Sequence, residues 1–115
     1  MSEAYDDFQE GRRRLRAGQT AQATVPLEKA KRREPDKTSI RETLGIAYFR
    51  LGRFEDAEAE FRAVLERSPV NDYAHYALGR CLDKLGREVE AQGHYKLALS
   101  LRPGDQHYEA RVRAS

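Results

Sequence analysis

The stretch LGRFEDAEAEFRAVLERSP, from Leu51 to Pro69, returns downstream as LGREVEAQGHYKLALSLRP, from Leu85 to Pro103. The two copies are offset by 34 residues, and Pro35 lies the same distance before Pro69. Further columns align at this offset: Gly11, Gly45 and Gly79; Gly18, Gly52 and Gly86; Ala23, Ala57 and Ala91; Ala30, Val64 and Ala98. A fixed period of this length is typical of stacked repeats, in which each unit buries its apolar face only against its neighbours.

Within each unit the apolar residues have helical spacing. The first stripe of the second unit is Ile40, Leu44, Ala47, Tyr48 and Leu51, and the second stripe is Ala57, Phe61, Val64 and Leu65. These steps of three and four predict two helices, and therefore a helical hairpin in each unit. Gly52 and Gly86 lie where the chain must reverse, and glycine adopts positive φ there without steric cost. Gly45 and Gly79 fall inside helices, which predicts close approach of the paired helix.

The ends of the helices carry their own signals. Pro35, Pro69 and Pro103 are expected to end the second helix of each unit. The residues that follow are candidate caps of the next helix, namely Asp36, Asn71 and Asp105. In the first unit, Pro26 predicts a kink or a late helix start near Thr24, because proline has no N–H and clashes with the preceding turn.

Small, Leu-Gly, Tyr, Ala, aromatic, Ala and Pro at these positions resemble the tetratricopeptide repeat, a family of 34-residue helix-turn-helix units. The resemblance rests on Leu44, Gly45, Tyr48, Ala57, Phe61, Val64 and Pro69, and on Leu78, Gly79, Leu82, Ala91, Tyr95, Ala98 and Pro103. The first unit departs from it, because Glu10 and Arg14 replace the leucine and the tyrosine; these two side chains can pair one turn apart.

The resemblance implies an all-α fold: a right-handed α-solenoid of three hairpins with a short C-terminal capping helix. We expect one domain over residues 1–115, with repeats at 4–37, 38–71 and 72–105 and the cap at 106–115. In the cap, Tyr108 and Val112 have the spacing to dock on the third hairpin.

Composition restricts the function. The net charge is +2 although 35% of the residues are charged, which indicates a mixed-charge surface without a large field of one sign. No run approaches about 18 apolar residues, and the charged N-terminus does not resemble a secretory signal. We therefore expect no membrane insertion. The single cysteine, Cys81, cannot form an internal disulfide, so we expect the cytoplasm as the compartment.

In this family the resemblance assigns ligand binding to the concave surface, formed mainly by the first helix of each unit. The stripe left there once the core stripe is removed supplies the candidate site: Tyr5, Phe8, Arg12, Arg16, Glu42, Ile46, Phe49, Arg50, Tyr73, Tyr76, Arg80 and Lys84. Five cations stand against two carboxylates, Glu42 and Asp83, and Tyr and Arg are enriched at interface hot spots. This pattern favours a peptide or helix with apolar and acidic side chains. The alternative is that the apolar members only cover seams between helices and the arginines are solvated.

One subtype of the family, the carboxylate clamp for chaperone C-termini, requires lysine, asparagine and arginine at five positions. This sequence has Phe8, Arg12, Thr43, Tyr73 and Ala77 there, and only Arg12 keeps a comparable charge. We therefore predict that the chain is not a clamp of this subtype.

Other chemistry is not supported. Cys81 aligns with Ala47 in the core stripe, which indicates a buried thiol. His75, His94 and His107 share no helical face, so we expect no metal site and no cofactor. No nucleophile has an evident base and no phosphate loop is present, so we expect no enzyme. The run RRRLR, Arg12 to Arg16, is spread around a helix, so we interpret it as a charged helix rather than a nucleic-acid site.

The sequence thus predicts a protein-protein interaction module, an adaptor or scaffold that binds another protein or peptide in its groove. The alternative is a structural unit that forms homo-oligomers through incompletely capped ends.

Overall fold

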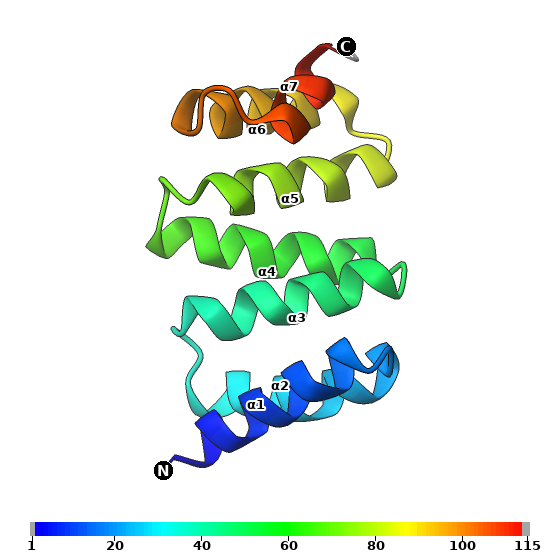
Figure 1. Ribbon diagram of the computed structural model, residues 1–115, viewed down its shortest axis with the longest axis vertical. Coiled ribbons are helices and arrows are strands. Elements are labelled where there is room, and N and C mark those ends of the chain that lie inside the picture. Colours follow the sequence, from blue (N-terminus) through cyan, green and yellow to red (C-terminus); the bar gives the residue numbers. More distant parts are fainter. Residues whose placement is uncertain (1, 114–115) are drawn as a thin grey trace.

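The structure is a computed structural model that describes residues 2–113, and it folds into stacked helical hairpins. The helices are α1 (Glu3–Arg16), α2 (Thr20–Arg33), α3 (Thr38–Arg50), α4 (Phe54–Arg67), α5 (Asp72–Lys84), α6 (Glu88–Leu101) and α7 (Gln106–Arg113). Helices pair as α1 with α2, α3 with α4 and α5 with α6, and each pair packs on the next. Figure 1 shows the pairs stacked along the longest axis, with the two termini at opposite ends. The principal extents are 43 × 24 × 21 Å, so the predicted all-α solenoid is confirmed.

The turn inside each hairpin depends on a glycine. Gly52 and Gly86 have φ of 76° and 81°, as the sequence predicted, and Gly18 has φ of 80°. At Gly52 the reversal is closed by two hydrogen bonds: Gly52 N–H donates to the Phe49 carbonyl at 3.0 Å and Arg53 N–H donates to the Tyr48 carbonyl at 2.9 Å. These bonds satisfy carbonyls that the end of α3 leaves without a helical partner.

Glycines inside the first helix of each hairpin admit a large side chain from the second helix. A Cβ on Gly45 would lie 2.9 Å from Cζ of Phe61, and one on Gly79 would lie 2.6 Å from Cε1 of Tyr95. Both distances are shorter than real Cβ contacts, so the ring occupies the space that a side chain would need. Close approach of the paired helices is confirmed as the reason for these glycines.

Two predictions about helix starts are wrong. The helix that contains Pro26 begins at Thr20, not near Thr24, because its first turn forms directly after the Gly18 turn as in the other hairpins. A kink at Pro26, the other outcome that the sequence allows, stays a prediction. Pro26 is buried there. Asp36 does not cap α3: Lys37 is the N-cap residue without a side-chain hydrogen bond, and Asp36 instead forms an ion pair with Arg67.

The other two caps and the C-terminal helix are confirmed. Asn71 Oδ1 accepts from Ala74 N–H at 2.9 Å, and Asp105 Oδ1 accepts from Tyr108 N–H at 3.1 Å. The Tyr108 side chain is buried and its hydroxyl donates to Asp72 Oδ2 at 2.7 Å, which ties α7 to α5. Val112 packs against the core. Within residues 2–113 no helix is long and apolar enough to cross a bilayer.

The second and third hairpins each have a pair of polar side chains that meet between their two helices, but the residue types of the pair differ. In the second unit Arg41 Nη1 lies 3.0 Å from Glu60 Oε1, and Lys31 of α2 binds the other oxygen of this buried carboxylate at 2.6 Å. At the same two positions, 34 residues later, His75 and His94 lie with their Nδ1 atoms 3.1 Å apart. An ion pair in one hairpin is therefore replaced by a stacked histidine pair in the next.

Candidate functional site

A pocket of about 500 Å³ opens between the second and third hairpins. Its walls come from α3, α4 and α5, so it is formed only when two neighbouring units stack. Seven of the residues predicted for the concave surface line it: Ile46, Phe49, Arg50, Tyr73, Tyr76, Arg80 and Lys84. The structure thus brings together predicted residues from two different repeats at one place.

The floor of the pocket is aromatic. Phe49 meets Phe54 edge to face with centroids 5.1 Å apart, and Tyr73 meets Phe61 in the same manner at 6.3 Å. Tyr76 lies between Tyr73 and the cap, with its ring 6.4 Å from the ring of Tyr73. Aromatic rings held by such contacts form a rigid apolar surface with little side-chain entropy to lose on binding.

The rim of the pocket is cationic. The Arg80 guanidinium lies over the Phe49 ring, 4.7 Å from its centroid, a cation–π contact that keeps the charge at the pocket mouth. Arg50 and Lys84 also line the mouth and are exposed. Among residues 2–113, none of the three has a carboxylate within 4.0 Å.

The carboxylates near the groove are engaged elsewhere. Glu42 Oε2 accepts a hydrogen bond from Asn71 Nδ2 at 3.2 Å. Asp83 Oδ2 accepts one from the buried Tyr95 hydroxyl at 2.6 Å. Burial, with the carboxylate of Glu42 nearby, raises the pKa of the Tyr73 hydroxyl, so Tyr73 is neutral at pH 7. Neither Glu42 nor Asp83 forms an ion pair with a cation of the rim in the described part of the chain.

The predicted residues on α1 lie outside this pocket. Tyr5 is 46% exposed, Phe8 packs partly against the core, and the Arg12 guanidinium lies 5.5 Å from the centroid of the Phe8 ring. Arg16 is exposed at the end of the helix. Glu42, the remaining predicted residue, lies on α3 but does not line the pocket either. The twelve predicted residues thus divide into a pocket group and a group on the first unit and its border.

Sequence reasoning missed part of the pocket wall. Phe54 and Phe61 belong to α4, the second helix of its unit, and Ala77 lies beside Tyr76 on α5. Both phenylalanines lie outside the first-helix stripe, and Phe61 also belongs to the core. The position of Phe54 directly after the turn glycine was a usable signal, because it brings an aromatic ring back toward Phe49.

Two of the histidines form a contact between helices that the sequence analysis did not predict. His75 and His94 come from different helices and meet, and His75 Nε2 lies 2.8 Å from the Pro69 carbonyl, which fixes its proton on that nitrogen. Burial first, and then the charge of His75, lowers the pKa of His94. Across residues 2–113 no three side chains of the ligating types gather where a metal could bind.

Cys81 is buried in the core, as predicted. Burial raises the pKa of its thiol to about 12, which keeps the thiol protonated at neutral pH.

Helical hairpins stacked into a groove define the chain as an α-helical repeat protein. The family model described as Tetratricopeptide repeat matches residues 42–106, and a second model with the same description matches residues 14–69. The chain belongs to the tetratricopeptide repeat family, as its sequence resemblance indicated. This family and fold are those of protein-interaction modules.

Two curated relatives are much longer than this chain. Superkiller complex protein 3 of Mus musculus is 32% identical over 88 residues, which are 76% of this chain and 6% of the relative. Phagocyte signaling-impaired protein of Drosophila pseudoobscura pseudoobscura is 30% identical over 101 residues, which are 85% of this chain and 10% of the relative. The chain thus spans a tenth or less of the length of these relatives.

Solved structures share the fold over nearly the whole chain. A structure of MamA (MSR-1) has a TM-score of 0.86 at 29% identity, and the match covers 94% of this chain and 62% of the MamA chain. The Arabidopsis OM64 tetratricopeptide domain has a TM-score of 0.92 at 18% identity, and the match covers 96% of this chain and 92% of the OM64 domain. The first such domain of Spaghetti (RPAP3), bound to an HSP90 peptide, has a TM-score of 0.92 at 21% identity, with 97% and 89% covered. The last two likenesses show the fold alone.

Proposed function

We propose that this chain is an adaptor or scaffold module that binds a protein segment carrying apolar and acidic side chains in its concave groove. The observation that carries the proposal is the pocket between α3 and α5, which has an aromatic floor and a rim of cations without carboxylate partners. An apolar anchor would displace water from the floor, and carboxylates beside it would bind the rim. The proposed role is binding without catalysis, in a reducing cytosol.

The proposal is tested by selection of a displayed random peptide library on the wild-type chain. We expect the enriched peptides to combine apolar and acidic residues. Arg80→Glu should weaken their binding about tenfold or more, because it removes an attraction and adds a repulsion at the pocket mouth. Arg32→Glu is the matched control: Arg32 is exposed on α2, away from the pocket, so the same charge change there should leave affinity unchanged.

Two results would contradict the proposal. One is a selection that enriches no peptide above background on the wild-type chain. The other is equal binding of the selected peptides by Arg80→Glu and Arg32→Glu. Circular dichroism of both variants establishes that each one is folded before affinities are compared.

Self-assembly through the chain ends stays the alternative prediction. Such an interface would have to use residues other than Tyr108 and Val112, because both side chains pack against the third hairpin. Light scattering over a range of concentrations tests this alternative. The division into repeats at 4–37, 38–71 and 72–105 and the exclusion of the chaperone-tail clamp also stay predictions.

A further inference from the structure

The aromatic floor of the pocket between α3 and α5 is not required by the stacking of repeats. Three of its rings correspond, 34 positions earlier, to polar side chains near the seam between the first two hairpins: Phe54 to Thr20, Tyr73 to Ser39 and Tyr76 to Glu42. The helices α2 and α3 pack on each other at that seam without such rings. Apolar surface beyond the needs of packing is typical of an interaction site, so these rings are available to a ligand.

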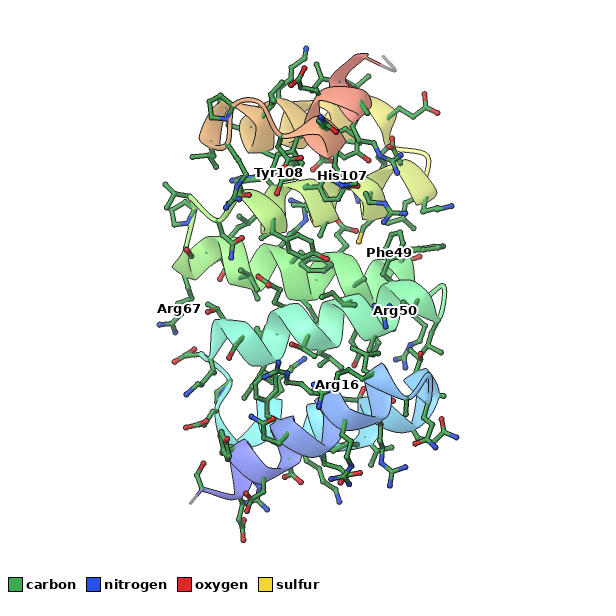
Figure 2. The ribbon with its side chains drawn as sticks, in the orientation of Figure 1. Arg16, Phe49, Arg50, Arg67, His107 and Tyr108 are labelled. Carbon is green, nitrogen blue, oxygen red and sulfur yellow. The ribbon has the colours of Figure 1, made fainter. Side chains whose placement is uncertain are left out.

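The rim of the pocket gathers three cations of the chain. Arg50 lies on α3, and Arg80 and Lys84 lie one turn apart on α5. Figure 2 shows Arg50 beside Phe49 at one edge of the stack, opposite Arg67. Arg67 pairs with Asp36, whereas the three rim cations have no carboxylate within 4.0 Å among the residues described. Like charges one turn apart repel each other, and an anion bound between them relieves this repulsion.

The Tyr73 hydroxyl adds a neutral donor beside the rim. Burial raises the pKa of this hydroxyl and Glu42 adds to the rise, whereas the charges of Arg80 and Arg50 oppose it. Both guanidinium groups are therefore within electrostatic range of the Tyr73 oxygen. The hydroxyls of Tyr95 and Tyr108 donate to carboxylates of the chain, but that of Tyr73 makes no such bond to the residues described.

A phosphoryl group matches this rim better than a carboxylate does. A carboxylate brings one negative charge and two oxygens, whereas a phosphorylated side chain carries about −1.5 to −2 charges at pH 7 and three strong acceptor oxygens. Guanidinium groups bind phosphate oxygens through charge-assisted, often bidentate hydrogen bonds. Arg50, Arg80 and Lys84, with the Tyr73 hydroxyl, offer enough donors for all three oxygens.

The floor favours an aromatic group next to the phosphate. In phosphotyrosine a ring lies between the backbone and the phosphate, so the ring can contact the floor while the phosphate stays at the rim. Phosphoserine has no ring, so it would leave the floor in contact with water. The pocket volume of about 500 Å³ lies within the range of sites that hold small ligands, so a single phosphotyrosine side chain has room there.

The orientation of the floor rings disfavours a nucleobase. Phe49 and Phe54 are inclined at 68°, and Phe61 and Tyr73 at 74°. Proteins that bind single-stranded nucleic acid stack each base flat on an aromatic face. Rings at these angles present edges as well as faces, which suits edge-to-face contacts with one phenyl ring.

We infer that the pocket between α3 and α5 binds a phosphotyrosine side chain of a partner protein. Arg50, Arg80 and Lys84 bind the phosphate, the Tyr73 hydroxyl donates a hydrogen bond to it, and the phosphotyrosine ring lies on the aromatic floor. This inference rests on the proposed function and adds the anchoring residue of the ligand. It also adds a form of regulation, because phosphorylation of the partner would strengthen binding.

Fluorescence anisotropy with four labelled peptides tests the inference. The peptides share the sequence Gly-Ser-Glu-X-Leu-Ser-Gly, in which X is phosphotyrosine, tyrosine, phosphoserine or glutamate. We expect the phosphotyrosine peptide to bind at least about tenfold more tightly than each of the others, because only its side chain reaches both floor and rim. Its affinity should fall with added salt, and should drop about three- to tenfold in Arg80→Gln and about two- to fivefold in Tyr73→Phe. Arg32→Gln is the matched control and should not change it.

Each other outcome has a defined meaning. The inference is overturned if the glutamate or phosphoserine peptide binds as tightly as the phosphotyrosine peptide, or if Arg80→Gln binds it as tightly as Arg32→Gln. Displacement of the peptide by an equal concentration of inorganic phosphate would show an anion site without selection for the ring. Tighter binding of a single-stranded oligouridylate would assign the pocket to nucleic acid, and both of these results also overturn the inference.

Failure of the inference can be distinguished from failure of the proposed function. If the phosphotyrosine peptide does not bind while the displayed library yields ligands sensitive to Arg80→Glu, the inference fails alone. If the library also yields nothing, both fail.

Discussion

Gly79→Ala and Gly93→Ala form a matched pair in which the same methyl group should have opposite effects. Both glycines lie inside helices of the third hairpin, where alanine is favoured over glycine by about 1 kcal/mol. A Cβ on Gly93 meets nothing within 4 Å, so Gly93→Ala should raise the free energy of unfolding by about 1 kcal/mol.

At Gly79 the methyl group collides with a ring that cannot move freely. The added Cβ would lie 2.6 Å from Cε1 and 2.8 Å from Cδ1 of Tyr95, whose side chain is fully buried and whose hydroxyl is bound to Asp83. Insertion of a methyl group into such a core costs about 1–3 kcal/mol. The helix-propensity gain of about 1 kcal/mol offsets part of this cost, so we expect Gly79→Ala to lower the free energy of unfolding by up to about 2 kcal/mol.

Urea denaturation followed by circular dichroism measures both effects as shifts of the midpoint at unchanged slope. The midpoint should fall for Gly79→Ala and rise for Gly93→Ala. A Gly79→Ala chain as stable as Gly93→Ala would refute the reasoning, because it would mean that Tyr95 adapts without loss and that the glycine is not required by close packing.

Three further predictions concern single side chains. The native state lowers the pKa of His94, so below the ordinary histidine pKa of about 6.5 the unfolded chain binds more protons than the native chain. The free energy of unfolding should therefore be constant above that pH and fall as the pH drops through the native pKa of His94. His94→Gln should flatten this fall, measured as urea midpoints between pH 7.5 and 5. The Cys81 thiol should react with a thiol reagent at pH 8 much more slowly in the native chain than in urea, because it is buried and protonated; equal rates would contradict its placement. Tyr108→Phe should lower the free energy of unfolding by about 1 kcal/mol through loss of the hydrogen bond to Asp72, and an unchanged urea midpoint would show that the bond adds nothing.

The backbone of the fold was readable from the sequence because local chemistry determines it. Gly52 is required by a positive φ and Gly45 by the Phe61 ring, and both requirements recur at the 34-residue period. Asn71 caps an unpaired N–H, and this cap recurs at Asp105 but not at Lys37. The prediction failed where one local signal outweighs another. Pro26 remains inside a helix, since the hairpin turn at Gly18 determines where that helix starts.

The candidate site was less accessible, because its parts meet only in three dimensions. A stripe of first-helix residues could be extracted from the period, but the contribution of Phe54 depends on the path of the chain after the turn. The contact between His75 and His94 depends on packing between helices. These two residues lie 34 positions after Arg41 and Glu60, which form an ion pair in the second hairpin. Which cations stay unpaired also follows from contacts that no sequence period contains.

The third hairpin has a histidine pair where the second hairpin has an ion pair, so the second hairpin suggests substitutions for the third. Because residues 34 apart occupy corresponding positions in the hairpins, Arg41 and Glu60 show that an ion pair fits where His75 and His94 meet in the third hairpin. The substitutions His75→Arg and His94→Glu would place an ion pair there instead of two stacked imidazole rings. One repeat of this chain can therefore supply the residues for changing the interior of another repeat, while the remaining units keep their sequence.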